Sequence, residues 1–271
     1  MPHRAGQAVL KILNEWIDLK KGIRIMINSK MIKLVGLVLV LFSVAGAQRW
    51  DNIDGRAAKI TVAPDGIIWT LAKDQRIFKS KTNTGGGWNN PGGKGVEIAA
   101  APSGIIWIIS EDQKIFKSKT TKGGGWNNPS GKAVKIAVAP SGIAWIINSE
   151  QKIFRSKSPK GGGWVNVPGK AVEIAVAPDG IVWIVSPDQR IFKSKTAEGG
   201  GWNNPSGSAV KIAVGPDGIA WIVDAEQRIF KSKHNKGGGW VRVDGKAVEI
   251  AIGPDGTVWV INFEGRIFRR M

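Results

Sequence analysis

The sequence predicts an all-β fold, a six-bladed β-propeller of four-stranded blades in which the N-terminal strand completes the last blade. Three observations predict it. The chain repeats with a period of 38 residues, each period contains four short β-type runs, and the last period lacks a fourth run that the N-terminal part supplies. Repeats of about 40 residues with four strands each are typical of propellers.

The period is set by tryptophan. Of the 13 tryptophans, only Trp16 lies outside two series that advance in steps of 38 residues. The first series is Trp50, Trp88, Trp126, Trp164, Trp202 and Trp240; the second is Trp69, Trp107, Trp145, Trp183, Trp221 and Trp259. Such regular positions predict that the tryptophans are mainly buried between blades, where each ring could cover on the order of 200 Å².

One unit illustrates the four runs. From Ala133, "AVKIAVAP" is followed by the turn at 140–142, the apolar run "IAWIIN", the run "QKIFRSK", a glycine-rich loop and "GWVNV" before Pro168. Short β-rich runs between turn residues indicate antiparallel strands, and runs that are apolar on both faces suit a sheet covered on both sides. An open β-solenoid is the alternative architecture.

Closure of a ring is favoured by the two ends of the repeat region. The last unit stops at "GRIFRRM", after its third run. We expect its missing strand to come from Gln48–Asp54, which would tie the ends together and remove the exposed sheet edges of an open array.

A charge alternation also favours an even-numbered ring. The third residue of the first run is in turn Lys59, Glu97, Lys135, Glu173, Lys211 and Glu249. The first strand of a propeller blade is innermost, so these residues should line the central channel, each Lys between two Glu. Because exposed ion pairs contribute only about 0–1 kcal/mol each, we expect the ring to specify register and closure and not catalysis.

The N-terminal part predicts export. Residues 31–47 combine Lys33, an apolar stretch and the small-residue sequence Ala45-Gly46-Ala47, as in a signal peptide cleaved after Ala47. The apolar stretch is short of the roughly 20 residues that span a bilayer, although an uncleaved anchor is the alternative. We therefore divide the chain into residues 1–30, a possible start misassignment or surface-binding helix, the signal peptide 31–47, and the propeller 48–271, and expect a secreted protein.

Composition excludes several chemistries. The chain of 271 residues has no cysteine and two histidines, His3 and His234, that form no metal-binding spacing. Disulfides, thiol catalysis and Cys-ligated metals are therefore excluded, and no cofactor or metal is expected. The blades are too alike to show the unequal roles that a catalytic site needs, so we do not expect an enzyme.

Cations gather at the ends of the third runs. The net charge is +18, and each "KSK" sequence places two cations on one side of a strand. We name these residues the basic crown and expect it to attract phosphate, sulfate or carboxylate polymers, although lysines can also serve only solubility. Its members are Lys79, Lys81, Lys117, Lys119, Arg155, Lys157, Lys193, Lys195, Lys231 and Lys233, with Arg269 and Arg270 as the sixth pair.

The opposite face should display amides, which offer donors and acceptors to sugar hydroxyls. Turn formation is the competing explanation for the same residues. The candidate carbohydrate-binding residues are Asn52, Asn90, Asn128, Asn166, Asn204, Gln75, Gln113, Gln151, Gln189 and Gln227.

The unit resembles the tectonin repeat. The paired tryptophans, the glycine before the second of them and the "IAV" run carry the resemblance, which covers Trp50 to Phe268; in one unit these are Trp126, Gly142, Trp145 and residues 136–138. The family includes fish-egg lectins and related lipopolysaccharide-binding lectins of innate immunity, which implies a six-bladed propeller that binds glycans. The chain has no cysteine or tyrosine, so sugar specificity is not carried over.

The leading hypothesis is a secreted multivalent lectin for repetitive, anionic microbial surface glycans such as lipopolysaccharide. The alternative is a non-lectin scaffold that binds a protein or an anionic polymer through the basic crown. Nucleic acid is not an expected partner of a secreted chain, and no stable membrane insertion is expected after signal cleavage.

Overall fold

The computed structural model describes residues 49–271, and the chain divides into the units Met1–Ala47 and Gln48–Met271. The predicted N-terminal extension 1–30 and signal peptide 31–47 lie outside the described residues. The described part of the second unit consists of 21 strands in six antiparallel sheets, which confirms the all-β prediction. Within residues 49–271, no helix is long and apolar enough to cross a membrane.

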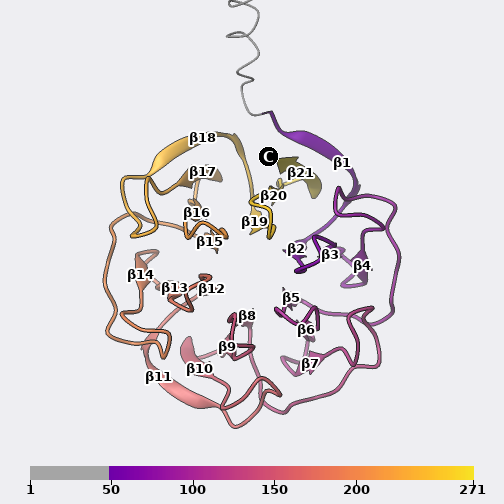
Figure 1. Ribbon diagram of the computed structural model, residues 1–271, viewed down its shortest axis with the longest axis horizontal. Helices are drawn as coiled ribbons and strands as arrows, with labels where there is room; N and C mark the ends of the chain where they lie inside the picture. The colour runs from indigo at the N-terminus through magenta and orange to yellow at the C-terminus, as the bar shows by residue number, and fades with distance from the viewer. Residues whose placement is uncertain (1–48) are drawn as a thin grey trace, which may run out of the picture. The chain divides into compact units, whose positions relative to one another are not determined.

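The sheets follow one another along the chain and lie around a central opening (Figure 1). Sheet 1 contains β2 (Lys59–Val62), β3 (Ile68–Leu71) and β4 (Ile77–Lys79), and sheet 2 contains β5 (Glu97–Ala100), β6 (Ile106–Ile109) and β7 (Ile115–Lys117). Sheet 3 contains β8 (Lys135–Val138), β9 (Ala144–Ile147), β10 (Lys152–Arg155) and β11 (Val165–Lys170). Sheet 4 contains β12 (Glu173–Val176), β13 (Val182–Val185) and β14 (Ile191–Lys193). Sheet 5 contains β15 (Lys211–Val214), β16 (Ala220–Val223), β17 (Arg228–Lys231) and β18 (Val241–Lys246). Sheet 6 contains β19 (Glu249–Ile252), β20 (Val258–Ile261), β21 (Arg266–Arg270) and β1 (Asp51–Arg56).

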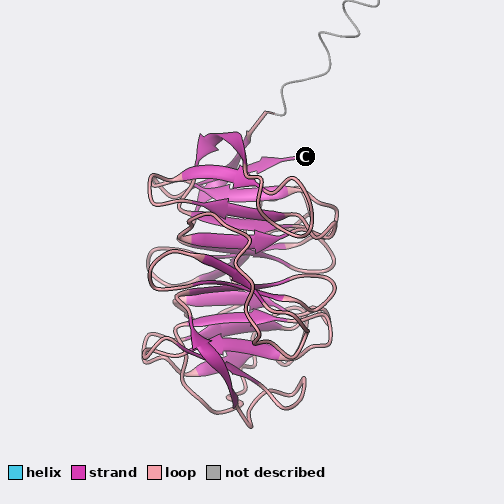
Figure 2. Cartoon of the chain, turned by 90° about the vertical axis from the view of Figure 1, so that its left-hand side faces the viewer, coloured by secondary structure: helices cyan, strands magenta, loops and turns pink. Residues whose placement is uncertain are grey.

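The innermost strands make the ring. Each of β2, β5, β8, β12, β15 and β19 contacts its neighbours in that order, and β19 contacts β2. The strands run between two loop-bearing faces (Figure 2). One face carries the turns between first and second strands and the glycine-rich loops; the other carries the turns between second and third strands and the links to the next sheet.

The N-terminal strand completes sheet 6, as predicted. β1 pairs with β21, with Asp51 opposite Arg269 and Ile53 opposite Ile267. Figure 1 shows the two ends of the described chain side by side in this sheet. The pairing covers the edge of β21 that the truncated last repeat would otherwise expose.

The prediction of four strands in every sheet is wrong for three of them. Sheets 1, 2 and 4 have three strands, and isolated bridges such as Lys79 to Asn89 and Arg76 to Lys94 stand where a fourth would be. These sheets carry the sequence Asn-Asn-Pro after the tryptophan, whereas sheets 3 and 5 carry "VNV" and "VRV". Proline has no N–H for the ladder, so regular pairing stops there.

The second strand of each sheet is the most buried element. All four residues of β3, β6, β9, β13, β16 and β20 are buried, because neighbouring sheets cover both of their faces, as the apolar runs indicate.

The packing between sheets explains one glycine of each "GGG" loop. A Cβ added to Gly161, at φ +84°, would lie 2.5 Å from Cη2 of Trp107 in the preceding sheet. The loop can lie over the buried indole only because this residue has no side chain.

The serine of the "KSK" sequence has a structural role. Ser156 accepts a hydrogen bond from the backbone N–H of Ala144 at 3.0 Å and donates one to the carbonyl of Ser158 at 2.8 Å. The serines at 80, 118, 194 and 232 make the same two bonds or the first of them. The buried hydroxyl therefore holds the start of the second strand to the glycine-rich loop.

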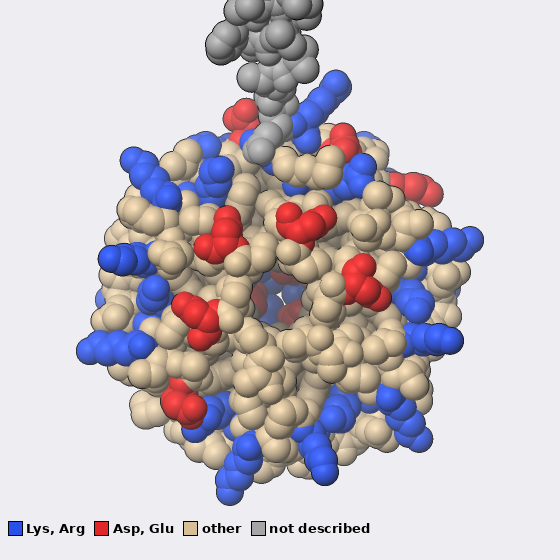
Figure 3. Space-filling view, in the orientation of Figure 1, with Lys and Arg blue, Asp and Glu red and all other residues tan. Residues whose placement is uncertain are grey.

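The predicted ring of alternating charges lines the channel, where both signs are visible (Figure 3). Lys135 lies 3.0 Å from Glu97 and 2.9 Å from Glu173. Lys59 and Lys211 each contact two glutamates at 2.9–3.3 Å. Each Lys thus lies between two Glu, as predicted, and Lys59 with Glu249 joins the last repeat to the first.

Candidate functional site

Three pockets of the same construction lie between adjacent sheets. They are named here by the sheets that form them: pocket 3/4, of about 420 Å³, pocket 4/5, of about 380 Å³, and pocket 5/6, of about 240 Å³. Most of their lining residues recur at steps of 38. Each pocket contains a tryptophan of the first series, the phenylalanine of the third strand and an aliphatic residue of the second strand: Trp202, Phe192 and Ile184; Trp240, Phe230 and Ile222; Trp50, Phe268 and Val260.

The tryptophan is held by the preceding sheet. In pocket 3/4, Nε1 of Trp202 donates a hydrogen bond to the carbonyl of Pro168 at 2.7 Å. A Cβ on Gly169, at φ +124°, would come within 2.7 Å of that nitrogen, so glycine permits the close approach. Trp50 and Trp240 donate equivalent bonds to Asp244 at 2.6 Å and Ser206 at 3.2 Å. Since all three tryptophans remain partly exposed, their rings are fixed surfaces and not core alone.

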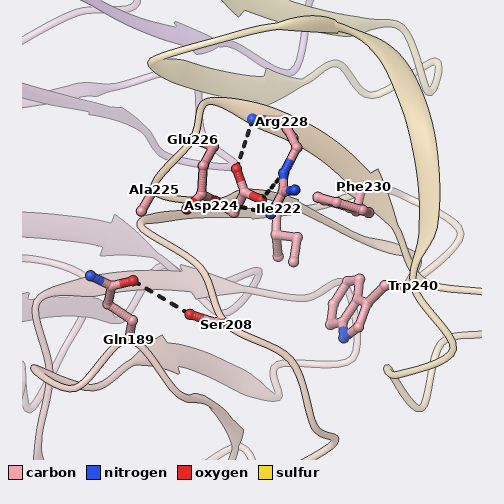
Figure 4. A pocket seen from close by; sticks show the side chains of 9 residues that line it. All are labelled: Gln189, Ser208, Ile222, Asp224, Ala225, Glu226, Arg228, Phe230 and Trp240. Carbon is pink, nitrogen blue, oxygen red and sulfur yellow. Dashed lines mark hydrogen bonds and ion pairs between the residues drawn. The ribbon is translucent and has the colours of Figure 1, made fainter.

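Pocket 4/5 has the most polar mouth (Figure 4). The Arg228 side chain donates from Nε to Asp224 at 2.6 Å and from a terminal nitrogen to Glu226 at 2.9 Å. Its guanidinium lies 5.8 Å from the centre of the Phe230 ring. On the opposite wall, Ser208 donates to the side chain of Gln189 at 3.4 Å. The pocket therefore offers an aromatic wall with donors and acceptors at its rim.

The acid and base at this mouth stay charged. Burial raises the pKa of Asp224, which is 6% exposed, but hydrogen bonds from the Arg228 side chain and backbone outweigh it and leave the pKa below its ordinary value. The hydrogen bond to Asp224 in turn raises the pKa of Arg228. Near neutral pH the pair remains an anion and a cation.

Pockets 3/4 and 5/6 carry a lysine where pocket 4/5 has Ser208. These are Lys170 and Lys246, the last residues of β11 and β18. Pocket 3/4 also contains Arg190, bound to Asp188 at 2.6 Å. Pocket 5/6 has no such acid and adds Phe263, which is 67% exposed.

This arrangement suits a small polar molecule with one apolar face. An indole beside a phenyl ring offers a flat apolar surface, and the rim supplies hydrogen-bonding and charged groups. Concave sites that are mainly apolar with a few placed polar groups are typical ligand sites. Among residues 49–271, no cluster of three or more His, Asp or Glu side chains is arranged to hold a metal ion.

The predicted asparagines lie at the surface, and most serve turns. Oδ1 of Asn90 accepts from the backbone N–H of Gly92 at 2.7 Å, and Asn128 and Asn204 accept from Ser130 and Ser206 at 2.6 Å. Asn166 donates to the carbonyl of Ile153 at 3.3 Å. Asn52 lies exposed in β1, opposite Phe268. The structure therefore gives the turn explanation a direct basis for three of the five.

The predicted glutamines occupy left-handed turn positions. Gln75, Gln113, Gln151, Gln189 and Gln227 have φ between 65° and 69°. Their carbonyls accept from the next link between sheets, as Gln189 does from Ala209 at 2.9 Å. Gln189 alone among them lines one of the three pockets. The amide candidates are therefore not brought together in one site.

The basic crown divides into two groups. Lys79, Lys117, Lys193 and Lys231 place their ammonium groups 5.0–5.7 Å from the rings of the buried tryptophans of their own sheets, and Arg155 forms an ion pair with Glu198. The second members, Lys81, Lys119, Lys157, Lys195 and Lys233, are exposed, and the described part of the chain gives them no ion-pair partner. Figure 3 shows cations around the edge of this face, with acidic side chains nearer the channel.

Sequence reasoning missed the pockets and their aromatic walls. Trp50, Trp202 and Trp240 were expected to be core, and Phe192, Phe230, Phe268, Lys170 and Lys246 were not predicted as site residues. A signal was present: the second tryptophan series lies in wholly apolar runs, whereas the first is flanked by Gly and polar residues. That difference could have indicated partial exposure.

Comparison with known proteins identifies a family. The model of the tectonin domain matches residues 17–200 and 193–271. No curated protein matches the chain significantly.

Several solved structures have a similar fold. A gluconolactonase from Xanthomonas campestris superposes with a TM-score of 0.62 at 11% identity, over 84% of this chain and 92% of that one. The calcium-binding protein regucalcin from Agrobacterium tumefaciens gives 0.60 at 17% identity, over 81% and 90%. YCF48 from Cyanidioschyzon merolae gives 0.54 at 13% identity, over 82% and 84%. At these identities the likeness concerns the fold alone.

Proposed function

Because this chain belongs to the tectonin family, we propose that it is a lectin whose sites lie between the blades of a six-bladed β-propeller. The six sheets are the blades, and the pairing of β1 with β21 closes the ring. The observation that carries the proposal is the recurrence of one aromatic-walled pocket at three junctions between sheets.

The pocket chemistry matches a saccharide. The C–H face of a sugar ring is apolar and stacks on aromatic rings, while its hydroxyls need donors and acceptors at the rim. The indoles of Trp50, Trp202 and Trp240 are fixed by hydrogen bonds to the backbone of the preceding sheet. Stacking therefore requires little ordering of the protein, which favours binding.

Repetition supplies avidity. A shallow sugar site binds weakly, at about millimolar Kd or about −4 kcal/mol. Several sites on one rigid ring can raise binding to a repetitive surface by about 10²–10⁴-fold. We propose microbial surface glycans, such as lipopolysaccharide, as the target, with the exposed lysines of the basic crown adding attraction to their anionic groups, and a secreted, non-catalytic protein as its setting.

A glycan array with the full chain tests the proposal. We expect saturable binding that persists at 0.5 M salt for part of the ligands and that falls at least about tenfold in Trp202→Ala/Trp240→Ala, the loss expected when about 1.4 kcal/mol of stacking disappears. Trp202→Phe/Trp240→Phe retains an aromatic wall and controls for folding. No saturable binding to any glycan would refute the lectin proposal.

A second candidate function is supported by the five exposed lysines of the crown. It is a scaffold that binds an anionic polymer by charge alone. Such binding fades steeply with salt and should be unaffected by the tryptophan changes, so the same array and salt series separate the two.

A further inference from the structure

The three pockets share their aromatic walls but differ at one repeated position. We propose that this position, Lys170, Ser208 or Lys246, divides the pockets into two specificity classes. Pockets 3/4 and 5/6 take an acidic saccharide, and pocket 4/5 takes a neutral one. The inference rests on the proposed function and assigns substrate classes to its sites.

The repeated position belongs to one sheet and faces the pocket of the next. Lys170 lies opposite Lys152 in sheet 3, and Lys246 lies opposite Arg228 in sheet 5. Like charges opposite each other in a sheet are unfavourable. The third-strand cation is compensated by the acid two residues earlier, as Lys152 is by Glu150 at 2.6 Å and Arg228 by Glu226 at 2.9 Å.

Because the acid is engaged by the third-strand cation, the lysine of the fourth strand has no close ion pair. Lys170 and Lys246 are exposed at the pocket mouths, and within residues 49–271 neither forms an ion pair closer than 4 Å. Lys170 feels the charge of Glu150, but that carboxylate is held by Lys152 at 2.6 Å. A lysine opposite another cation and without a close ion pair contributes little to the fold. Its ammonium is available to an anionic group of a ligand seated on the aromatic wall.

The charges that line the pockets differ in sign. Lys170, Arg190 and Asp188 give pocket 3/4 a net charge of +1, and Lys246 gives pocket 5/6 the same. In pocket 4/5, Asp224 and Glu226 exceed Arg228 by one negative charge, since Ser208 is neutral. Neighbouring sites of one ring therefore differ by two charges.

This difference selects ligands. A carboxylate or phosphate on a sugar gains a charge-assisted contact from Lys170 or Lys246. The same group in pocket 4/5 would meet Asp224 and Glu226, which repel it. Neutral hydroxyls, in contrast, can accept from Arg228 and donate to the acids or to Gln189, whose side chain Ser208 contacts at 3.4 Å.

The test exchanges lysine and serine at the repeated position between the two classes of pocket. Lys170→Ser/Lys246→Ser and Ser208→Lys are measured in the full chain on an array that pairs each neutral saccharide with its uronic-acid and its phosphorylated counterpart. The matched control is Lys122→Ser/Lys160→Ser, which removes the same charge from two exposed loop residues that line none of the three pockets. Calorimetry on the best ligand of each class gives the number of sites.

We expect the double lysine variant to weaken acidic saccharides about tenfold, as one lost charge-assisted contact does, and to spare neutral ones. Ser208→Lys should add one acidic site and lower neutral binding. Acidic binding that is unchanged in Lys170→Ser/Lys246→Ser, or reduced equally by the loop control, would overturn the inference while leaving the lectin proposal standing. An array without any bound glycan would refute the proposed function itself.

Discussion

The charge ring offers a stability test that depends on closure. Glu173 lies 2.9 Å from Lys135 and 3.0 Å from Lys211. Glu173→Gln keeps the shape of the side chain and removes its charge, so each of these lysines retains only one glutamate. Glu97 and Glu249 also contact two lysines each, so Glu97→Gln and Glu249→Gln are equivalent changes.

The expected loss is about 3 kcal/mol of unfolding free energy. Two unit charges at 3 Å attract by about 5.5 kcal/mol at an effective dielectric constant of about 20, but desolvation cancels much of this gain. Removing one partner of a buried ion pair costs about 3–5 kcal/mol. The ring side chains retain 12–20% exposure, which places Glu173 at the lower end of that range.

Urea and thermal unfolding of the parent and of two variants measure the effect. A loss of about 3 kcal/mol corresponds to a fall in Tm of about 6–12 °C for a domain of this size. The control is Glu150→Gln, which makes the same chemical change in the exposed pair with Lys152, where side-chain exposure is 65% and 53%, and should cost below about 1 kcal/mol. Equal stability of Glu173→Gln and Glu150→Gln would refute the claim that the ring holds the sheets in register.

Three further perturbations test the closure and packing of the ring. Deleting residues 48–54 removes four of the six residues of β1 and exposes the edge of β21, so Tm should fall and aggregation rise. An unchanged melting curve would contradict the role of this strand. Gly161→Ala should lower the unfolding free energy by about 2–3 kcal/mol, because overpacking against Trp107 adds to backbone strain. The control Gly200→Ala, with φ +74° and no atom within 4 Å of the added Cβ, should show the backbone strain alone, about 1 kcal/mol. Equal losses in the two variants would contradict the packing argument. Burial raises the pKa of Glu173, but Lys135 and Lys211 outweigh it and lower the pKa below its ordinary value. The stabilisation by Glu173 is therefore present above pH ~4.3 and is lost as pH falls through the lower pKa of the folded state. An equally steep fall of the unfolding free energy at acid pH in the parent and in Glu173→Gln would exclude this contribution.

Sequence reasoning predicted the features that depend on one repeated register. The 38-residue period, the missing fourth run and the Lys/Glu alternation each concern residues that occupy equivalent backbone positions. Equivalent positions in a ring meet their neighbours by symmetry, so the contacts of Lys59, Lys135 and Lys211 follow without knowledge of side-chain packing.

The pockets could not be predicted in the same way. Each combines a residue at the end of one sheet with aromatic residues of the next, so it depends on how two neighbouring sheets pack. The turn roles of the amide residues have a local cause. Gly265 stands where the other repeats have glutamine, which indicated a left-handed turn position and hence a backbone role for Gln75 and its equivalents.

Specificity in a repeat protein has to come from departures from the repeat. The buried positions recur almost unchanged, because every junction between sheets has the same packing to satisfy. The turn after the second strand varies more, and its first residue is in turn Ala72, Ser110, Asn148, Ser186, Asp224 and Asn262. Three of these residues lie at pocket mouths, beside the position occupied by Lys170, Ser208 or Lys246. Both positions can change charge without disturbing the aromatic wall, so one fold presents a constant stacking surface with a rim that varies from site to site. Under the proposed lectin function, the constant part supplies avidity and the variable part supplies discrimination, so substitutions at the rim are expected to alter which glycan is bound before they alter stability.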